Sequence, residues 1–286
     1  MAKRDAREVT AELVGRALRG DRAALSEVVE HIQDDVYNLA LRMTGTRADA
    51  EDATQEIALQ VVTHLAQWRA EASFRTWVWR IASRHLMRRR ENRFEELCSF
   101  EVLTGLCAAG AASPALPTTD PVELEVLERE LRLVCTEGML LSLDRDHRLA
   151  WILAEVFELD GDDGAAVLEI EPATYRKRLS RARARLGAWM EASCGLVSPR
   201  NGCNCRRQIP IAMGAGVLDR AQLPLATHPV RAADRRGRLK VLEANADAMD
   251  LAAHVVCGHP DYATPTDVVA RIRELVASRS LPLLDG

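Results

Sequence analysis

The sequence has few aromatic residues, no long apolar run and almost no net charge. Phe, Trp and Tyr make up 4% of its 286 residues, and the formal net charge is −4. No apolar stretch approaches the ~20 residues of a transmembrane helix, so we expect no membrane partner. The first residues, Met1–Asp5, lead into a polar pattern and not into the apolar core of a secretory signal, which predicts a cytoplasmic protein.

Cysteine is present without indicating a disulfide framework. The seven cysteines are an odd number in a chain with no secretory signal, which leaves metal binding, redox sensing or simple burial as their roles. A hydrophobic share of 48% with 28% charged residues argues against bulk disorder. A length of 286 residues allows two or three modules.

The spacing of apolar residues predicts an all-α protein. In most of the chain these residues recur every three or four positions, as they do in helices. Residues 104–121 lack this period, are rich in glycine, proline and small residues, and are predicted to be a linker. Residues 194–210 are predicted to be irregular. Helices are expected within residues 6–94 and 122–192, and at about 240–256 and 266–278.

A helix rich in carboxylates is predicted from Arg47 to Trp68. One stripe of it is apolar and should be buried: Ala50, Ala53, Ile57, Val61 and Leu65. Another face is acidic and suits a basic partner helix: Asp49, Glu51, Asp52, Gln55 and Glu56. The alternative is a solvated helix face with favourable acids in its first turn.

The next helix, Phe74–Arg90, combines an apolar stripe with arginines and tryptophans. The stripe consists of Phe74, Val78, Ala82 and Leu86. Arginines four residues apart repel one another in an isolated helix, whereas a polyanion would attract them. Guanidinium groups that bind phosphates and rings that stack on bases suit an opened DNA strand. The predicted DNA-binding residues are Arg75, Trp77, Trp79, Arg80, Arg84 and Arg88. Alternatively, the tryptophans are core residues and the arginines are solvated.

Residues 160–191 have the pattern of a helix-turn-helix. Asp160 is placed to cap a short helix, and Pro172, favoured at a first helical position, opens a second one after a three-residue turn. The second helix has an apolar stripe from Tyr175 to Trp189 and six cations before its first acid. Such a helix can read guanine edges in the major groove. The predicted DNA-binding residues are Thr174, Tyr175, Arg176, Lys177, Arg178, Arg181 and Arg183. A basic surface helix is the alternative.

In order and separation, these segments resemble the conserved regions of small alternative sigma factors of the extracytoplasmic-function group. Asp49–Glu56 and Phe74–Ala82 are similar to the polymerase-binding and promoter-melting segments of region 2. Leu141–Arg148, Glu155–Phe157 and Thr174–Arg183 are similar to region 4. The resemblance implies a region 2 domain, a flexible linker, a region 4 domain and a C-terminal helical extension, at residues 1–97, 98–120, 121–192 and 193–286.

The resemblance also implies the partners. The acidic helix would dock on the coiled-coil clamp of core RNA polymerase, the basic aromatic helix would capture the non-template strand of the minus-ten element, and the helix-turn-helix would read the minus-thirty-five element. The chain would then be an alternative sigma factor for promoter recognition and transcription initiation, not an enzyme, with no required cofactor and with an anti-sigma factor as a further partner. Glu169, where many members have a turn glycine, and Gly164, inside the first helix, predict a less stable motif.

The extension carries thiols with three open interpretations. Cys194, Cys203 and Cys205 lie in a turn-rich loop and could bind Zn or another metal if a further donor joined them. The other candidate donors are His254, Cys257 and His259. A redox switch aided by Arg206 and Arg207 and an inert loop are the other interpretations. Some sigma factors of this group have similar cysteine-containing extensions thought to sense metals or redox state. The remaining cysteines are predicted to be isolated small hydrophobes: Cys98, Cys107 and Cys135.

Two functions of other classes compete with the sigma-factor interpretation. An autonomous helix-turn-helix transcriptional regulator would explain the basic second helix but would leave the acidic helix and the tryptophan-bearing helix without a role. A metal-dependent enzyme in the C-terminal part would use His254, Cys257 and His259, but the sequence has no clear acid or base partner near them.

Overall fold

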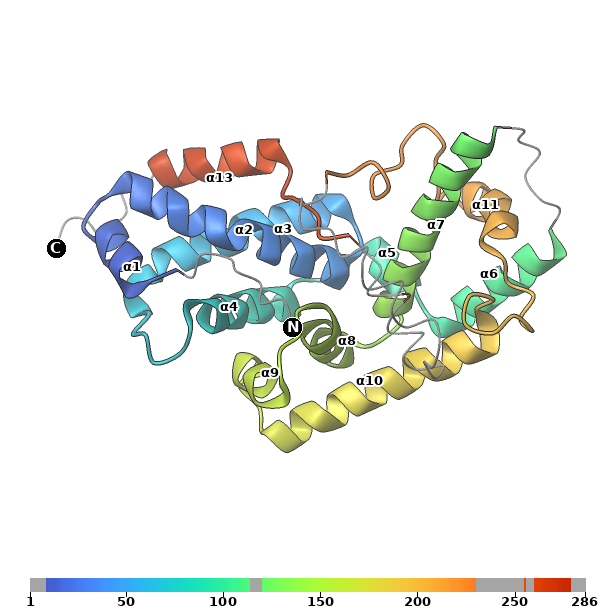
Figure 1. Cartoon of the computed structure of the whole chain (residues 1–286), viewed down its shortest axis with the longest axis horizontal. Coiled ribbons are helices and arrows are strands. Elements are labelled where there is room, and N and C mark those ends of the chain that lie inside the picture. The colour runs from blue at the N-terminus through green and yellow to red at the C-terminus, as the bar shows by residue number, and fades with distance from the viewer. Residues whose placement is uncertain (1–8, 114–119, 230–254, 256–259, 279–286) are drawn as a thin grey trace.

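The structure, a computed structural model, describes residues 9–113, 120–229, 255 and 260–278 (Figure 1). Within these ranges the regular elements are helices, and β-structure is limited to residues in isolated bridges such as Asp219–Gln222. The all-α prediction is confirmed. None of the described helices is both long enough and apolar enough to cross a bilayer.

The first helices form a bundle in which α2 packs along α3 while α1 and α4 contact this pair (Figure 1). Each α-helix of the bundle begins after a side chain that accepts a backbone N–H bond, in turn Thr10, Asp21, Thr46 and Ser73. The elements are α1 (Ala11–Leu18), α2 (Arg22–Thr44), α3 (Arg47–Thr63), the 3-10 turn η1 (Leu65–Gln67) and α4 (Phe74–Arg88).

The predicted apolar stripes of α3 and α4 are confirmed as core. Every member is nearly inaccessible to solvent: those from Ala50 to Val61 on α3, Leu65 at the start of η1, and those from Phe74 to Leu86 on α4. The predicted end of the acidic helix is wrong. α3 stops at Thr63, and Trp68 lies beyond η1 in extended backbone.

Part of the predicted linker is helical. α5 (Arg93–Leu97) is followed by α6 (Phe100–Ala112), which Ser99 caps. The prediction that residues 104–112 lack regular structure is wrong because α6 packs against a helix about a hundred residues further along the chain. Local sequence carries no trace of that contact. Residues 114–119 of the predicted linker lie outside the described residues.

The second predicted helical block is confirmed. Its elements are α7 (Pro121–Leu141), α8 (Arg145–Trp151), the π-helical turn η2 (Ile152–Val156), α9 (Gly161–Leu168) and α10 (Pro172–Ser193). Asp160 accepts N–H bonds from residues 162 and 163, and Pro172 stands at the start of α10, as predicted. α9 and α10 therefore form the expected helix-turn-helix.

The C-terminal part is helical where a loop was expected. α11 (Cys205–Gly214) replaces the second half of the predicted irregular segment, with Asn204 as its cap. α13 (Thr266–Ser278) agrees with the prediction and packs along α3 and α2 (Figure 1). Apart from Val255, the helix predicted at 240–256 lies outside the described residues.

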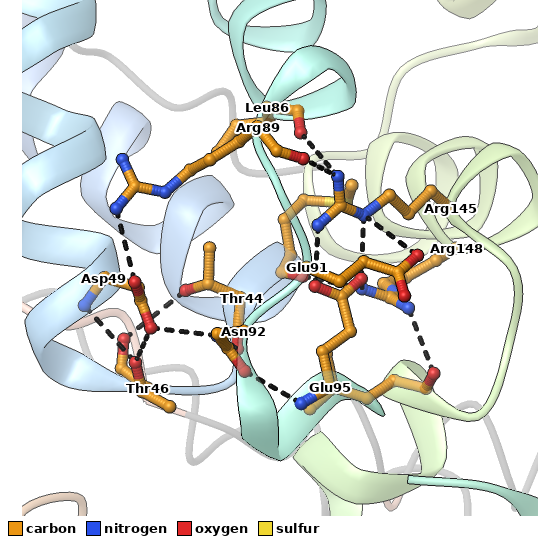
Figure 2. Close-up of polar contacts among 12 residues, drawn as sticks. Thr44, Thr46, Asp49, Leu86, Arg89, Glu91, Asn92, Glu95, Arg145 and Arg148 are labelled. Atoms are coloured by element: carbon orange, nitrogen blue, oxygen red, sulfur yellow. Dashed lines mark hydrogen bonds and ion pairs between the residues drawn. The ribbon is translucent and has the colours of Figure 1, made fainter. Parts of the chain in front are cut away.

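A buried ionic network connects the first bundle to the second block (Figure 2). Glu95 of α5, with a side chain 2% exposed, accepts bonds from Arg145 at 2.7 Å and Arg148 at 2.8 Å, both on α8. Arg148, also 2% exposed, donates to the carbonyl of Met43 on α2 at 2.6 Å. Its other acceptors are the carbonyls of Leu140, Leu141 and Leu143. One guanidinium thus fixes the position of three helices relative to α8.

Candidate functional site

The first turns of α10 present a row of cations to solvent. Arg176, Lys177 and Arg181 are exposed and line an open hollow together with Ala173 and Ser180. None of these three cations forms an ion pair within the described part of the chain. They are available to an anionic ligand.

The other cations of α10 have acidic partners within the protein. Arg178 lies 3.0 Å from Asp146, and Arg183 lies 2.5 Å from Glu155. Both acids belong to the α8–η2 stretch that α10 covers. These exposed or half-exposed pairs contribute little stability, so they orient the arginines without sequestering them.

Tyr175 does not face outward, and its predicted DNA contact is wrong for this arrangement. The ring is fully buried, and the hydroxyl donates to the carbonyl of Ala150 at 3.1 Å. A Cβ on Gly164 would lie 2.2 Å from the tyrosine ring, so only glycine allows α9 and α10 to pack this closely. The expectation that Gly164 weakens the motif is therefore reversed. Thr174, in contrast, is exposed as predicted.

The turn between α9 and α10 contains a strained residue. Glu169 has φ +55°, the left-handed region in which glycine is at ease and other residues are not. The presence of glutamate in place of a turn glycine therefore costs backbone strain. The Glu169 carboxylate accepts two hydrogen bonds from Arg84 of α4.

The two tryptophans of α4 lie in different environments. Trp79 is 1% exposed and packs against Phe157 with ring centroids 4.3 Å apart. It cannot stack on a base in this arrangement, so its predicted surface role is wrong here and the core alternative describes its position. Trp77 is half-buried, and its ring centroid lies 5.5 Å from that of Phe74. Arg75 is exposed and its guanidinium lies over the Trp79 ring at 5.7 Å.

The arginine row of α4 faces α9. Arg80 donates to the carbonyl of Ala166 at 2.9 Å, and Arg84 pairs with Glu169. Arg88, at the end of the helix, is exposed. Because α9 lies between α4 and α10 (Figure 1), the two cationic rows do not form one continuous surface. The structure is closed over the DNA-binding face predicted for α4.

The acidic side chains of α3 face different neighbouring elements. Asp49 contacts Arg89 at 3.2 Å and Asn92 at 2.9 Å on the α4–α5 side, where Glu56 also meets Arg89. Glu51 lies on the opposite side and is half-buried. Between these edges Asp52 is exposed and Gln55 is half-buried. This middle part of the predicted polymerase-binding face is accessible to a partner.

The cysteine loop lies beside a cysteine of α6 that is about a hundred residues away in the sequence. The thiols of Cys107, on α6, and Cys203 interact, and Gln208 of α11 donates to the Cys203 sulfur at 3.8 Å and to the Cys107 carbonyl at 3.1 Å. The interaction with Cys107, together with the bond from Gln208, lowers the pKa of Cys203. The prediction that Cys107 is isolated is wrong.

A metal site is not assembled in the described part of the chain. There, no three His, Cys, Asp or Glu side chains are arranged to hold a metal ion. Burial raises the pKa of Cys194 and Cys205 and so favours their neutral thiols over the thiolates that metals bind. The candidate additional donors, His254, Cys257 and His259, lie outside the described residues.

Comparison with known proteins points to one group. The sigma-70 region 2 family model matches residues 28–94, which include α3 and α4. The RNA polymerase sigma-H factor of Pseudomonas aeruginosa is 27% identical over 172 residues, 60% of this chain and 89% of the relative. The ECF RNA polymerase sigma factor SigW of Bacillus subtilis is 25% identical over 174 residues, 59% of this chain and 89% of the relative.

A third relative and one solved structure give similar coverage. The ECF RNA polymerase sigma-E factor of Escherichia coli is 28% identical over 171 residues, 60% of this chain and 88% of the relative. The solved structure is that of CnrH in complex with the cytosolic domain of CnrY. Its matching chain has a TM-score of 0.45 and 19% identity, over 65% of this chain and 99% of that chain.

Proposed function

Since this chain belongs to the extracytoplasmic-function group of the sigma-70 family, we propose that it binds core RNA polymerase and directs it to promoters as an alternative sigma factor. It contributes to transcription initiation in the cytoplasm, while the polymerase performs the chemistry. The observation that carries the proposal is the cationic row Arg176, Lys177 and Arg181 at the start of the second helix of a helix-turn-helix. Guanine edges and phosphates are the partners that such a row accepts.

In this arrangement α9 covers the arginines of α4, so DNA binding by α4 requires a rearrangement. Arg80 and Arg84 reach a DNA strand only after they leave the Ala166 carbonyl and Glu169. The Arg84–Glu169 pair is exposed on both sides, with side chains 55% and 46% accessible, so breaking it costs little. We infer that α9 moves away from α4 when the chain binds polymerase and promoter.

Run-off transcription with purified core polymerase tests the proposal. The full chain is expected to give promoter-dependent transcripts from a genomic fragment library, because a sigma factor adds promoter recognition to the core enzyme. An autonomous helix-turn-helix regulator would bind DNA but yield no such transcript with core enzyme alone. That outcome would favour the alternative and reject the sigma-factor function.

Reversal of one charge on α3 should weaken the polymerase complex. Asp52→Arg places a cation in the accessible middle of the acidic face, and like charges across an interface cost several kcal/mol, so binding in a pull-down should fall at least ~100-fold. Glu56 is less suitable because its substitution would also release Arg89. Glu125→Arg, on an exposed position of α7, is the matched control and should bind normally. Equal binding by both variants would assign the polymerase surface to other residues.

We also propose a regulatory role for the thiols of the extension. Hydrogen peroxide can oxidise the Cys203 thiolate to a sulfenic acid with release of hydroxide, and the Cys107 thiol can then attack the sulfenic sulfur, with release of one water, to form a disulfide. The metal prediction for Cys194, Cys203 and Cys205 requires a donor from outside the described residues, so it remains a proposal. An anti-sigma partner also remains a proposal.

Peptide mapping of the peroxide-treated full chain tests the redox role. A Cys107–Cys203 cross-link is expected in the wild type and should be absent in Cys107→Ser, which keeps the three thiols of the loop. Elemental analysis of the same preparations after zinc loading tests the metal role. A wild-type chain that neither cross-links nor retains zinc would leave the loop without a sensing function.

A further inference from the structure

The C-terminal segment covers one side of the α2–α3 pair. Residues 260–278, named here the strap, run over α2 and continue as α13 along α3 (Figure 1). They are separated from α2 by more than two hundred residues of sequence. The side of the bundle that the strap covers includes Glu51, one of the residues assigned to polymerase binding.

The strap is anchored by a buried backbone contact. Asn38 of α2 donates to the Tyr262 carbonyl at 2.7 Å and accepts from the Tyr262 N–H at 3.0 Å. Both residues are at most 1% exposed. Next to them, Asp34 accepts bonds from the N–H and the hydroxyl of Thr264, both at 2.8 Å. The buried side-chain amide of Asn38 pairs with both the backbone N–H and the backbone carbonyl of Tyr262. Because any shift of the strap would leave these buried groups without partners, the contact selects a single register.

A second contact supports the anchor from the preceding segment. The imidazole of His228 lies 3.0 Å from the Tyr37 hydroxyl, and its ring centroid is 4.9 Å from that of Tyr262. Glu130 of α7 accepts the N–H of Leu225 at 3.1 Å and that of Ala226. The anchor is therefore part of the packed molecule and not a chance contact of a chain end.

The helical part of the strap is held differently. Val268 and Ile272 are fully buried against the bundle. Around them, Arg271 lies 3.5 Å from Glu51, and Arg273 lies 2.7 Å from Glu30 of α2. Both arginines are about half exposed, 47% and 55%, so the ion pairs are screened and weak. α13 is an amphipathic helix with no net charge. Its apolar side packs on the bundle, and its two arginines face acids of α2 and α3.

We propose that the α2–α3 face is an interaction surface shared by two occupants, the strap and core polymerase, and that α13 must leave before polymerase binds completely. This inference depends on the proposed function. One edge of α3 cannot contact two helices at once, and Arg271 gives Glu51 the cationic neighbour that a basic polymerase helix would give it. The buried anchor at Asn38 keeps the strap attached while α13 is released, so the effective concentration for rebinding stays high.

Release of α13 by substitution should strengthen polymerase binding. In the full chain, Ile272→Asp puts a charge into the apolar contact, whereas Ala270→Asp adds the same charge at an exposed position of the same helix. When the binding-competent state is a minor fraction, the apparent Kd falls as that fraction rises. We expect the Kd for core polymerase to fall about tenfold in Ile272→Asp and to stay at the wild-type value in Ala270→Asp.

A milder pair of variants covers the case in which Ile272→Asp fails to fold, which its melting curve would reveal. Arg273→Glu opposes Glu30 and should lower the Kd a few-fold, and the added exchange Glu30→Arg should restore the wild-type value. Equal Kd values for the wild type and every folded strap variant would overturn the shared-surface inference while leaving the sigma-factor function intact. Absence of binding by all variants, Arg273→Glu included, would instead reject the proposed function on which it depends.

Discussion

Replacing Arg148 with alanine is expected to lower the free energy of unfolding by about 3–5 kcal/mol, the range for removal of one partner from a buried ion pair. Its guanidinium is 2% exposed and donates to Glu95 and to four backbone carbonyls. Alanine would leave those acceptors without a donor in a site that water cannot easily enter. Urea denaturation of the wild type and the variant at neutral pH measures the difference.

The pH dependence distinguishes lost charge from lost packing. Burial raises the pKa of Glu95, but the hydrogen bond from Arg145 and the charge of Arg148 outweigh it, so the net pKa is lowered. A lowered carboxyl pKa stabilises the fold above the usual value and ceases to do so on acidification. The deficit of Arg148→Ala should therefore shrink towards acid pH.

Arg132→Ala is a suitable control for this substitution. It removes an arginine from α7 that is 47% exposed and forms, among the described residues, one ion pair at 3.4 Å, and it should cost no more than about 1 kcal/mol. A similar small cost for Arg148→Ala would mean that the Arg148 network does not stabilise the junction of α2, α5, α7 and α8.

The double substitution of Arg176 and Lys177 with alanine should reduce promoter affinity about tenfold or more at constant salt, because each good base-edge contact contributes about 1–3 kcal/mol of discrimination. Both side chains are exposed at the start of α10 and form no ion pair with the described residues. The thermal midpoint should therefore stay at the wild-type value. Holoenzyme binding to promoter and to scrambled duplexes separates the loss of specificity from a uniform loss of charge.

Arg129→Ala provides the comparison for the double variant. It removes an exposed cation from α7, away from the helix-turn-helix, and should change promoter affinity by little beyond the general effect of one charge. If the double variant and this control discriminated equally well between promoter and scrambled DNA, base recognition would have to be reassigned to other residues.

The helices and their buried stripes were predictable because they depend on chemistry within one or two turns. Asp160 and Pro172 mark the ends of the helix-turn-helix through local capping and the fixed φ of proline. The apolar period of α4 identified Phe74 and Leu86 as core residues. The sequence placed Tyr175 both in the apolar stripe of α10 and among the residues near the DNA. The helical period predicted its buried position correctly, whereas its place at the start of the helix did not.

The contacts between distant segments were not predictable. α6 packs on α11, about a hundred residues further along the chain, and this packing brings Cys107 beside Cys203. The burial of Trp79 requires Phe157 from the second block, which no periodicity within α4 indicates. Arg148 is in a segment that resembles region 4, yet its buried position depends on Glu95 of α5 and on carbonyls from α2, α7 and the turn after α7.

The turn of the helix-turn-helix links two properties of the protein that are usually set separately. Glu169 holds an unfavourable backbone angle, and its carboxylate accepts hydrogen bonds from Arg84. Under the proposed function this carboxylate would compete with DNA phosphate for Arg84 and so reduce the net energy of capturing an open strand. A glycine at this position would relax the backbone and release the arginine in one step, so a single residue of the turn would set both the strain of the motif and the availability of α4 to DNA.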